Sequence, residues 1–432
     1  MEKSVYQNYV QILKEELIPA MGCTEPIAVA YAAAMARQTL GAQPQTLRVA
    51  ISGNIIKNVK SVVVPNTGGL RGIAAAAAAG AIAGDAARKL EVLSSVTPAQ
   101  ADEIAAYLQN AEITVSESKS GCIFDIDVTA EAGGHSAGVR ITGYHTNIVT
   151  IQKDGVTLLS RDYQEQSGDQ TERGMLSILG IVEFADAADL ADVKELLDRQ
   201  IAYNMAIARE GLRGDWGANI GNILQKAYGD SVAVRAKAMA AAGSDARMSG
   251  CELPVVVNSG SGNQGMTASL PVIVYAEALG VSDEQRYRAL LVSNLVTIHL
   301  KTGIGRLSAY CGAISAGCGA GAGVSYLYGG RYDEIAHTVV NALAINSGVI
   351  CDGAKPSCAA KIASAVEAGL LGMQMVRYGK EFFGGDGIVS KGVENTIRNV
   401  GELARDGMRD TDREILQIMI GNANSGAILS QS

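Results

Sequence analysis

The sequence predicts an α+β protein, with a large, mostly α-helical domain and a smaller inserted α/β domain that contains an antiparallel sheet. Strand patterns are confined to residues 44–156, and helical patterns broken by glycines recur from about residue 172 onward. Fifty glycines and only 5% aromatic residues favour helices that pack closely through small side chains. We therefore predict a helical domain formed by residues 1–43 and 157–432, and a small domain formed by residues 44–156.

The N-terminal part of the chain is predicted to contain two helices. Apolar residues recur at helical spacing from Tyr6 to Leu17, which indicates an amphipathic helix over residues 3–19 that ends at a proline. A second helix is predicted for residues 25–40. Thr24 is a suitable cap for it, and the proline that follows fits the first helical turn.

The predicted small domain begins with two strand patterns, at residues 46–52 and 61–65. Helices are then predicted for residues 69–89 and 98–110, the second with a threonine just before its first proline. Short strand segments with glycine turns between them follow in series, which is typical of an antiparallel meander. These segments are residues 112–118, 122–131, 135–144 and 147–155.

After residue 172 strand patterns nearly vanish, and helices are predicted between glycine-containing breaks. The predicted helices are residues 189–211, 217–228, 230–243, 265–279, 283–300, 307–327, 331–347 and 357–379. Three polar loops stand out in this region, at residues 257–265, 299–308 and 351–358. We expect such loops to carry functional residues that a helical scaffold positions.

Charge and composition exclude several classes of protein. The 36 basic and 44 acidic residues give a net charge of −8, which disfavours binding to nucleic acid or to an anionic membrane. The first residues are charged and lack the apolar stretch of a secretory signal, and the small-residue run at 73–84 is too short to span a bilayer. Seven cysteines in such a chain indicate reduced thiols and a cytoplasmic location.

Four of the cysteines cluster late in the chain, at Cys311, Cys318, Cys351 and Cys358. Their two C-x6-C spacings do not match a zinc ribbon, and four histidines supply few ligands for a mixed zinc site. Soft thiolates suit an iron–sulfur cluster, and a loop with glycine and proline could fold around one. The alternative is that these cysteines are small buried apolar residues, which is how we interpret the remaining pair, Cys122 and Cys251.

Cys23 lies immediately before the predicted start of a helix. Backbone N–H groups and the helix dipole favour a thiolate at such a position. The residue is therefore a candidate nucleophile or base, although on its own it is only a single cysteine.

Three separated motifs together resemble the L-cysteine desulfidase family, which is related to the iron–sulfur L-serine dehydratase α chains. They are MGCTEPIAVA at 21–30, KTGIGRLSAYCG at 301–312 and CDGAKPSCAAK at 351–361. The resemblance covers nearly the whole chain. It departs at Tyr310, where the family pattern leads us to expect a leucine more often.

The resemblance implies that the helical domain is the catalytic, cluster-binding domain. Three cysteines would hold a 4Fe–4S cluster in which one iron is not ligated by cysteine. Cys311, Cys351 and Cys358 would be these ligands, with Cys318 as a substitute for Cys311. Cys23 would be the catalytic thiol, acting as the base that removes the α-proton.

The implied reaction is the α,β-elimination of L-cysteine to pyruvate, hydrogen sulfide and ammonia. Dehydration of L-serine by the same machinery is the nearest alternative, and Cys23 in GCTEP, where the serine enzymes have a sequence similar to S-S-S-H-T, favours cysteine. A non-catalytic iron–sulfur or thiol sensor would instead have a cluster closed by four cysteines. A deaminase dependent on pyridoxal phosphate comes third, because the glycine-rich loop at 257–265 resembles its phosphate loop, whereas the strand pattern does not resemble its parallel sheet.

Several polar residues are candidates for binding the substrate. Asn258, Ser259 and Asn263 could contact its carboxylate, although tight-turn glycines explain their loop equally well. Lys301 and Arg306 could pair with the same carboxylate or lie in solvent.

His145, near a predicted strand end, could point from the small domain toward the site. The expected partners are a small amino-acid substrate and a second copy of the chain in a homodimer, without nucleic acid or membrane.

Overall fold

The computed structural model describes residues 1–162 and 171–421 as an α+β fold. Its helices are α1 (Lys3–Glu16), α2 (Thr24–Leu40), α3 (Gly53–Val59), α4 (Gly72–Ala83), α5 (Pro98–Asn110), α6 (Ile178–Ala187), α7 (Lys194–Arg213), α8 (Ile220–Tyr228), α9 (Val232–Met248), α10 (Gly262–Leu279), α11 (Asp283–Ile304), α12 (Gly312–Leu327), α13 (Tyr332–Ile345), α14 (Cys358–Arg377), α15 (Val393–Glu402) and α16 (Arg409–Gly421). Its strands are β1 (Pro19–Met21), β2 (Thr46–Ile51), β3 (Glu112–Glu117), β4 (Asp125–Ala132), β5 (His135–Thr142), β6 (Ile148–Lys153), β7 (Val156–Ser160) and β8 (Pro254–Val256).

A six-stranded sheet with the order β3-β2-β4-β5-β6-β7 forms one layer of the small domain. From β4 to β7 neighbouring strands are antiparallel, as the meander pattern predicts, but β2 and β3 are parallel. The parallel pair arises because α3, α4 and α5 lie between these strands in the sequence and return the chain to the same end of the sheet. The sheet is therefore mixed rather than wholly antiparallel.

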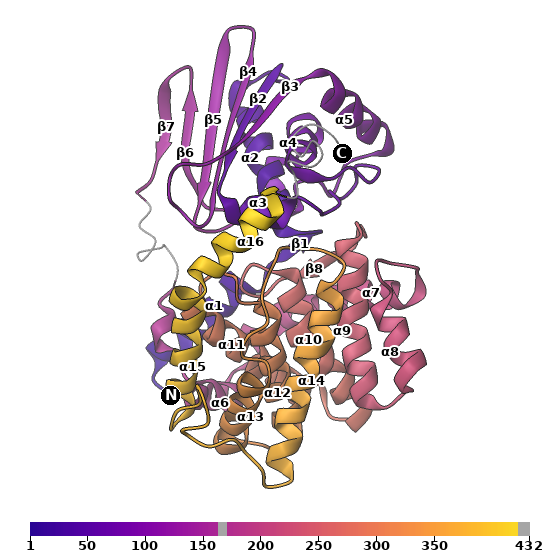
Figure 1. The fold of residues 1–432 in the computed structure, drawn as a ribbon, viewed down its shortest axis with the longest axis vertical. Coiled ribbons are helices and arrows are strands. Elements are labelled where there is room, and N and C mark those ends of the chain that lie inside the picture. Colours follow the sequence, from indigo (N-terminus) through magenta and orange to yellow (C-terminus); the bar gives the residue numbers. More distant parts are fainter. Residues whose placement is uncertain (163–170, 422–432) are drawn as a thin grey trace.

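Helix α2 packs on this sheet and on α4, next to β4 and β5 (Figure 1). The sequence analysis grouped this helix with the helical domain, which the packing contradicts. Nearly every side chain of α2 is buried, from Thr24 to Ala36, so its pattern has no polar face that would show which neighbours it has. The predicted strand at 61–65 also differs, because Val63 forms only an isolated bridge with Arg71.

In the helical part of the molecule, α12 is surrounded by α10, α11, α13 and α14. Its side chains are small and buried from Ala313 to Tyr326. Because Gly317, Gly321 and Gly369 have no side chains, the backbones of α12 and α14 are in direct contact. A Cβ on Gly317 would lie 2.2 Å from the carbonyl oxygen of Ala365. This close packing brings the N-termini of α12 and α14 together.

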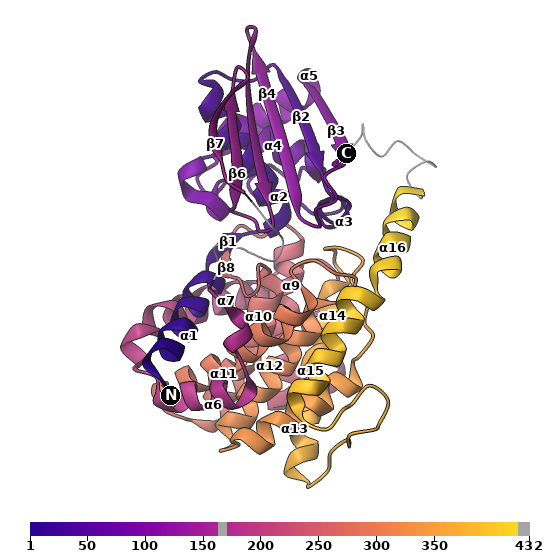
Figure 2. The same cartoon turned by 90° about the vertical axis from the view of Figure 1, so that its left-hand side faces the viewer.

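Two further connections join the small domain to the helical part. The two-stranded ladder of β1 and β8 lies between them. Helix α16 extends from the helical part along α3 of the small domain, as Figure 2 shows. There Asp412 pairs with the buried amine of Lys57 at 2.5 Å.

The first prediction concerns the buried carboxylate of Asp125, which accepts hydrogen bonds from Arg140 Nε at 2.8 Å and from the hydroxyls of Ser118, Ser120 and Thr142. Burial alone would raise the pKa of Asp125, but these partners hold it below its usual value. Its contribution to stability is therefore present above about pH 4 and is lost as the pH falls through its lower folded-state pKa. We expect Asp125→Asn to lower the free energy of unfolding by about 2 kcal/mol at pH 7, and by less in acid.

Urea denaturation at neutral and acidic pH measures this difference. Asp127→Asn is the matched control, because burial and the neighbouring Asp125 raise the pKa of Asp127, so loss of its charge should not destabilise the fold. Equal stability of Asp125→Asn and wild type at pH 7 would contradict the assignment.

The second prediction tests the contact between α12 and α14. Gly317→Ala should lower the free energy of unfolding by about 3 kcal/mol, because the added methyl group meets a helix backbone that cannot move alone. In Gly138→Ala, the control on β5, the methyl group would meet atoms no nearer than 4.0 Å. Thermal and urea unfolding of both variants measure the effect, and a Gly317→Ala protein as stable as the control would disprove the tight packing.

Candidate active site

Cys23 is placed by the pairing of β1 with β8. Val257 N donates to Ile18 O at 2.9 Å, and Thr24 Oγ1 donates to Gly260 O at 2.9 Å. The chain turns between β1 and α2 at Gly22, which has φ of +64° and lies so close to Pro65 that a Cβ would be 2.3 Å from its ring. Cys23 is the N-cap residue of α2, and Thr24, which the sequence pattern favours as the cap, is instead the first residue of the helix.

The other three cysteines come from separate segments. Cys311 is the N-cap residue of α12, Cys351 lies in the loop after α13, and Cys358 is the first residue of α14. Two backbone hydrogen bonds join the first two segments: Cys311 N donates to Val349 O at 3.0 Å and Cys351 N donates to Ala309 O at 2.6 Å. The loop that carries Cys351 then turns at Gly353 and leads directly to Cys358. Gly353 has φ of +94°, and a Cβ there would lie 2.3 Å from Lys57 O.

All four of these cysteines line one cavity of about 100 Å³. Among the other predicted site residues, five also line it: Ser259, Asn263, Lys301, Arg306 and His145. Two lie elsewhere. Asn258 is buried beneath the loop, where its amide donates to the side chain of Asn294 at 3.0 Å. Cys318 is buried inside α12 and does not line the cavity.

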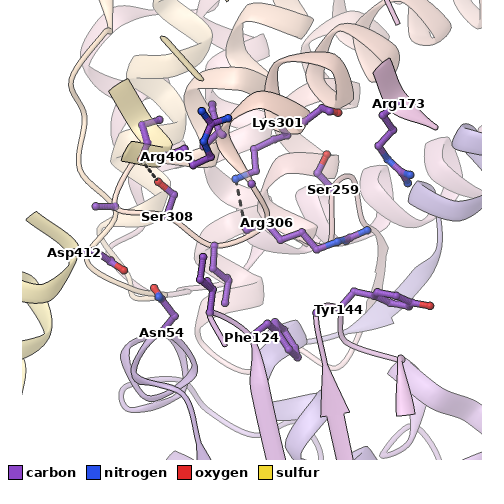
Figure 3. Close-up of a pocket in the computed structure, with 18 of the residues that line it drawn as sticks. Asn54, Phe124, Tyr144, Arg173, Ser259, Lys301, Arg306, Ser308, Arg405 and Asp412 are labelled. Carbon is purple, nitrogen blue, oxygen red and sulfur yellow. Dashed lines mark hydrogen bonds between the residues drawn. The ribbon is translucent and has the colours of Figure 1, made fainter. Parts of the chain in front are cut away.

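A larger cleft of about 1410 Å³ lies beside this cavity, between the small domain, the helical part and the C-terminal segment. Figure 3 shows Phe124 and Tyr144 from the small domain facing Lys301 and Arg306 across it. Lys301 and Arg306 line both spaces, as does Ser259. The cavity and the cleft therefore adjoin at these residues, and the cleft has room for a small substrate.

The surroundings of Cys23 favour the thiol over the thiolate. Its Sγ donates to Glu25 Oε2 at 3.2 Å. Burial raises the pKa of Cys23 well above its usual value, and the charge of Glu25 raises it further, while Arg247 lowers it only in part. Burial and a carboxylate two residues away therefore oppose the thiolate that the helix N-terminus favours.

Glu25 is the centre of a buried polar group. Asn58 Nδ2 donates to its Oε1 at 3.2 Å, and Thr24 Oγ1 donates to its Oε2 at 3.1 Å. Burial opposes ionisation, but His145, the Cys23 thiol and Arg247 lower the pKa of Glu25 to about 2. His145 Nε2 lies 3.9 Å from Glu25 Oε1, too far for a hydrogen bond, and is buried without a partner.

The other three thiols influence one another across the cavity. Burial raises the pKa of Cys311 to about 12, and the charges of Cys351 and Cys358 raise it too. Burial lowers the pKa of Lys301 to about 8, and Cys351 and Cys311 oppose this shift. These thiols and the amine are therefore close enough to interact electrostatically. Within the described part of the chain, no group of His, Cys, Asp or Glu side chains is arranged to hold a single metal ion.

Polar residues that were not predicted from the sequence also line the cavity, among them Asn58, Arg247 and Gln264. Asn58 belongs to α3, which was not predicted. Arg247 is in the last turn of α9, where a basic residue commonly complements the helix dipole and so gives no signal of a site. Gln264 follows the predicted loop residue Asn263, so the composition of this polar loop is the only feature of the sequence that points to it.

The whole chain is similar to several curated bacterial proteins that carry the name UPF0597 protein. One from Desulfitobacterium hafniense is 60% identical over 421 residues, which cover 97% of this chain and 98% of the relative. Others from Lachnoclostridium phytofermentans and Finegoldia magna are 50% and 48% identical over 96% of this chain, and the matches cover 100% and 99% of those relatives.

In the part of the chain that the structure describes, no helix combines the length and apolar character needed to cross a membrane.

The family model described as "Serine dehydratase alpha chain" matches residues 87–417, which include the cavity residues from α9 to α14. With this match and near full-length relatives, the chain belongs to the serine dehydratase α-chain family.

Proposed function

We propose that the protein is an iron–sulfur-dependent carbon–sulfur lyase that converts L-cysteine to pyruvate, hydrogen sulfide and ammonia. The observation that carries this proposal is the common cavity lined by Cys23 and by Cys311, Cys351 and Cys358. Three thiols could hold a cluster there while a fourth stays available for proton transfer. The family match supports a lyase of this general kind.

The donor set suits a 4Fe–4S cluster. Three thiols from separate segments line one cavity. A cluster takes each thiolate on a different iron, and soft thiolates are its usual ligands. Lys301 faces two of the thiols, and its charge would balance the negative charge that the thiolates acquire on binding iron.

Cys311, Cys351 and Cys358 would hold the cluster, which when bound supplies a Lewis-acidic iron for the departing sulfur. In the proposed elimination, Cys23 Sγ takes the α-proton of L-cysteine. The Cα–H electrons form the Cα–Cβ double bond, and the Cβ–S electrons leave with the sulfur as hydrosulfide, HS−. The proton taken up by Cys23 then converts the hydrosulfide to hydrogen sulfide and restores the Cys23 thiolate. The resulting aminoacrylate then reacts with water to give pyruvate and ammonia.

Cys23 can act as the base only as a thiolate, and burial and the charge of Glu25 raise the pKa of its thiol. Glu25 Oε2 is the nearest acceptor, at 3.2 Å. The unpaired Nε2 of His145 lies on the other side of the same carboxylate, where a proton on the imidazole would make an ion pair with it. We propose that the proton leaves along this path when substrate enters, which makes Glu25 and His145 positioning residues for the base.

Dehydration of L-serine is the second candidate function, and the serine dehydratase family match favours it specifically. The same residues would act in the same order, with water leaving in place of hydrogen sulfide. The sensor hypothesis can also be tested at Cys23. If Cys23 were a fourth ligand, it would close the cluster, and the protein would then have neither a free base nor an open iron.

The third prediction tests the ligand set. After anaerobic reconstitution with iron and sulfide, Cys311→Ser and Cys351→Ser should lose bound iron and all production of sulfide and pyruvate. Cys318→Ala should keep its iron, because that thiol does not line the cavity. Cys122→Ser serves as a matched control outside it. Iron loss in Cys318→Ala but not in Cys311→Ser would reverse the assignment.

The same assay, run on L-cysteine and L-serine, separates the candidate functions. Sulfide and pyruvate from L-cysteine support the desulfidase, and turnover of L-serine alone would identify a dehydratase. Full iron loading with neither reaction would indicate a closed cluster and a sensor. Activity that requires pyridoxal phosphate and not iron would refute the proposal.

The fourth prediction concerns the base. Cys23→Ala should retain full iron content but lose turnover by about 10³-fold, the usual contribution of a positioned general base. Exchange of the substrate α-proton with deuterated solvent should disappear in parallel, which measures proton removal directly. If the variant lost its iron as well, Cys23 would be a cluster ligand and the proposed role would fail.

A further inference from the structure

Arg247 is a buried cation that lines the cavity without a carboxylate partner. It is 2% exposed and extends from the end of α9 across Gly262. Its Nε donates to Gly22 O at 2.9 Å and its Nη1 donates to Asn263 Oδ1 at 3.1 Å. Both acceptors are uncharged. Among the described residues, no carboxylate lies within ion-pair distance of the guanidinium.

Two of the other cations that line the cavity have a carboxylate partner. Arg306 pairs with the buried carboxylate of Glu16 at 3.0 Å, and Lys57 pairs with Asp412. Lys301 faces the thiols of Cys351 and Cys311. Glu25 is near enough for Arg247 to lower its pKa, but the two groups form no ion pair. Because a buried charge without a directly paired counterion is costly, the guanidinium of Arg247 indicates that the site binds an anion there. Planar guanidinium groups hold carboxylates through paired hydrogen bonds.

Gln264 provides a second, independent observation in the same cavity. Its Oε1 is buried and accepts no hydrogen bond, although buried polar atoms in proteins nearly always have a partner. Its amide lies against Gly312, beside Cys311, where a Cβ on the glycine would be 2.6 Å from Nε2. The cavity thus contains an acceptor without a donor, Gln264 Oε1, and a cation without an ion-pair partner, Arg247. Together they are complementary to a ligand that carries both a positive and a negative charge.

We propose that Arg247 binds the α-carboxylate of the substrate and that Gln264 Oε1 accepts a hydrogen bond from its α-ammonium group. This inference rests on the proposed function in that the substrate is an amino acid, but it does not depend on which one. Neither residue takes part in bond breaking. The pair therefore recognises the backbone shared by cysteine and serine, and discrimination between sulfur and oxygen falls to the other cavity residues.

Calorimetric binding of L-alanine to the reconstituted protein tests this pair, because L-alanine has both charged groups and no leaving group. We expect Arg247→Met to weaken binding at least ~100-fold, and Arg247→Lys to restore part of it. Gln264→Leu should weaken binding of L-alanine but not of propionate, which has no ammonium group or other donor on its α-carbon. Arg235→Met, which removes a surface cation from the same helix, is the control and should bind L-alanine as wild type does.

Each outcome decides the assignment. Wild-type affinity for L-alanine in Arg247→Met, or no binding of L-alanine to the wild type, would overturn it. Loss of iron from Arg247→Met, compared with Arg247→Lys, would show that the guanidinium balances the cluster and would also overturn it. If binding of L-alanine depended on Arg247 but the protein turned over neither cysteine nor serine, the roles assigned to Arg247 and Gln264 would be supported and the proposed reaction would be refuted.

Discussion

The antiparallel pairing of β1 with β8 is the constraint on which the site depends, because it joins parts of the chain that are more than two hundred residues apart. The three residue pairs of this ladder, from Pro19–Val256 to Met21–Pro254, place Cys23 and the start of α2 beside the loop that opens α10. A shift in this register would move Cys23, Thr24 and the Glu25 carboxylate away from Gly260. The cavity would then lose its N-terminal wall, even with the helical part intact.

The opposite wall depends on close backbone packing instead. Glycines at the contact of α12 with α14 let these helices approach until a Cβ would clash, which brings Cys311 and Cys358, at the two N-termini, to the same cavity. Burial there has an electrostatic consequence, because it disfavours the charged form of each thiol in the absence of a positive partner. Lys301 and Arg247 supply positive charge beside these thiols. The packing that buries the cavity therefore also makes it suitable for binding anions.

Local patterns predicted most helices well, since glycine breaks and caps are local signals. Residues 98–110 form α5 with the predicted bounds, and its threonine cap and Gln100 complete a capping box. Non-local features were missed. An all-buried α2 gave no sign of packing on the sheet, and parallel pairing of β2 with β3 depends on the helices between them. Motif resemblance grouped the four cysteines of one cavity. Neither the burial that raises the pKa of Cys23 nor the absence of an ion pair at Arg247 can be predicted without knowing what surrounds these residues.

The central claim is that Cys311, Cys351 and Cys358 hold a cluster with an open iron in the cavity that Cys23 lines. Mössbauer spectroscopy of protein reconstituted with ⁵⁷Fe, recorded before and after adding L-cysteine, tests it most directly. The account predicts that one iron site differs from the others and that its isomer shift and quadrupole splitting alone change when substrate binds. Iron sites that are all ligated by cysteine and remain unchanged by L-cysteine and L-serine would contradict the claim.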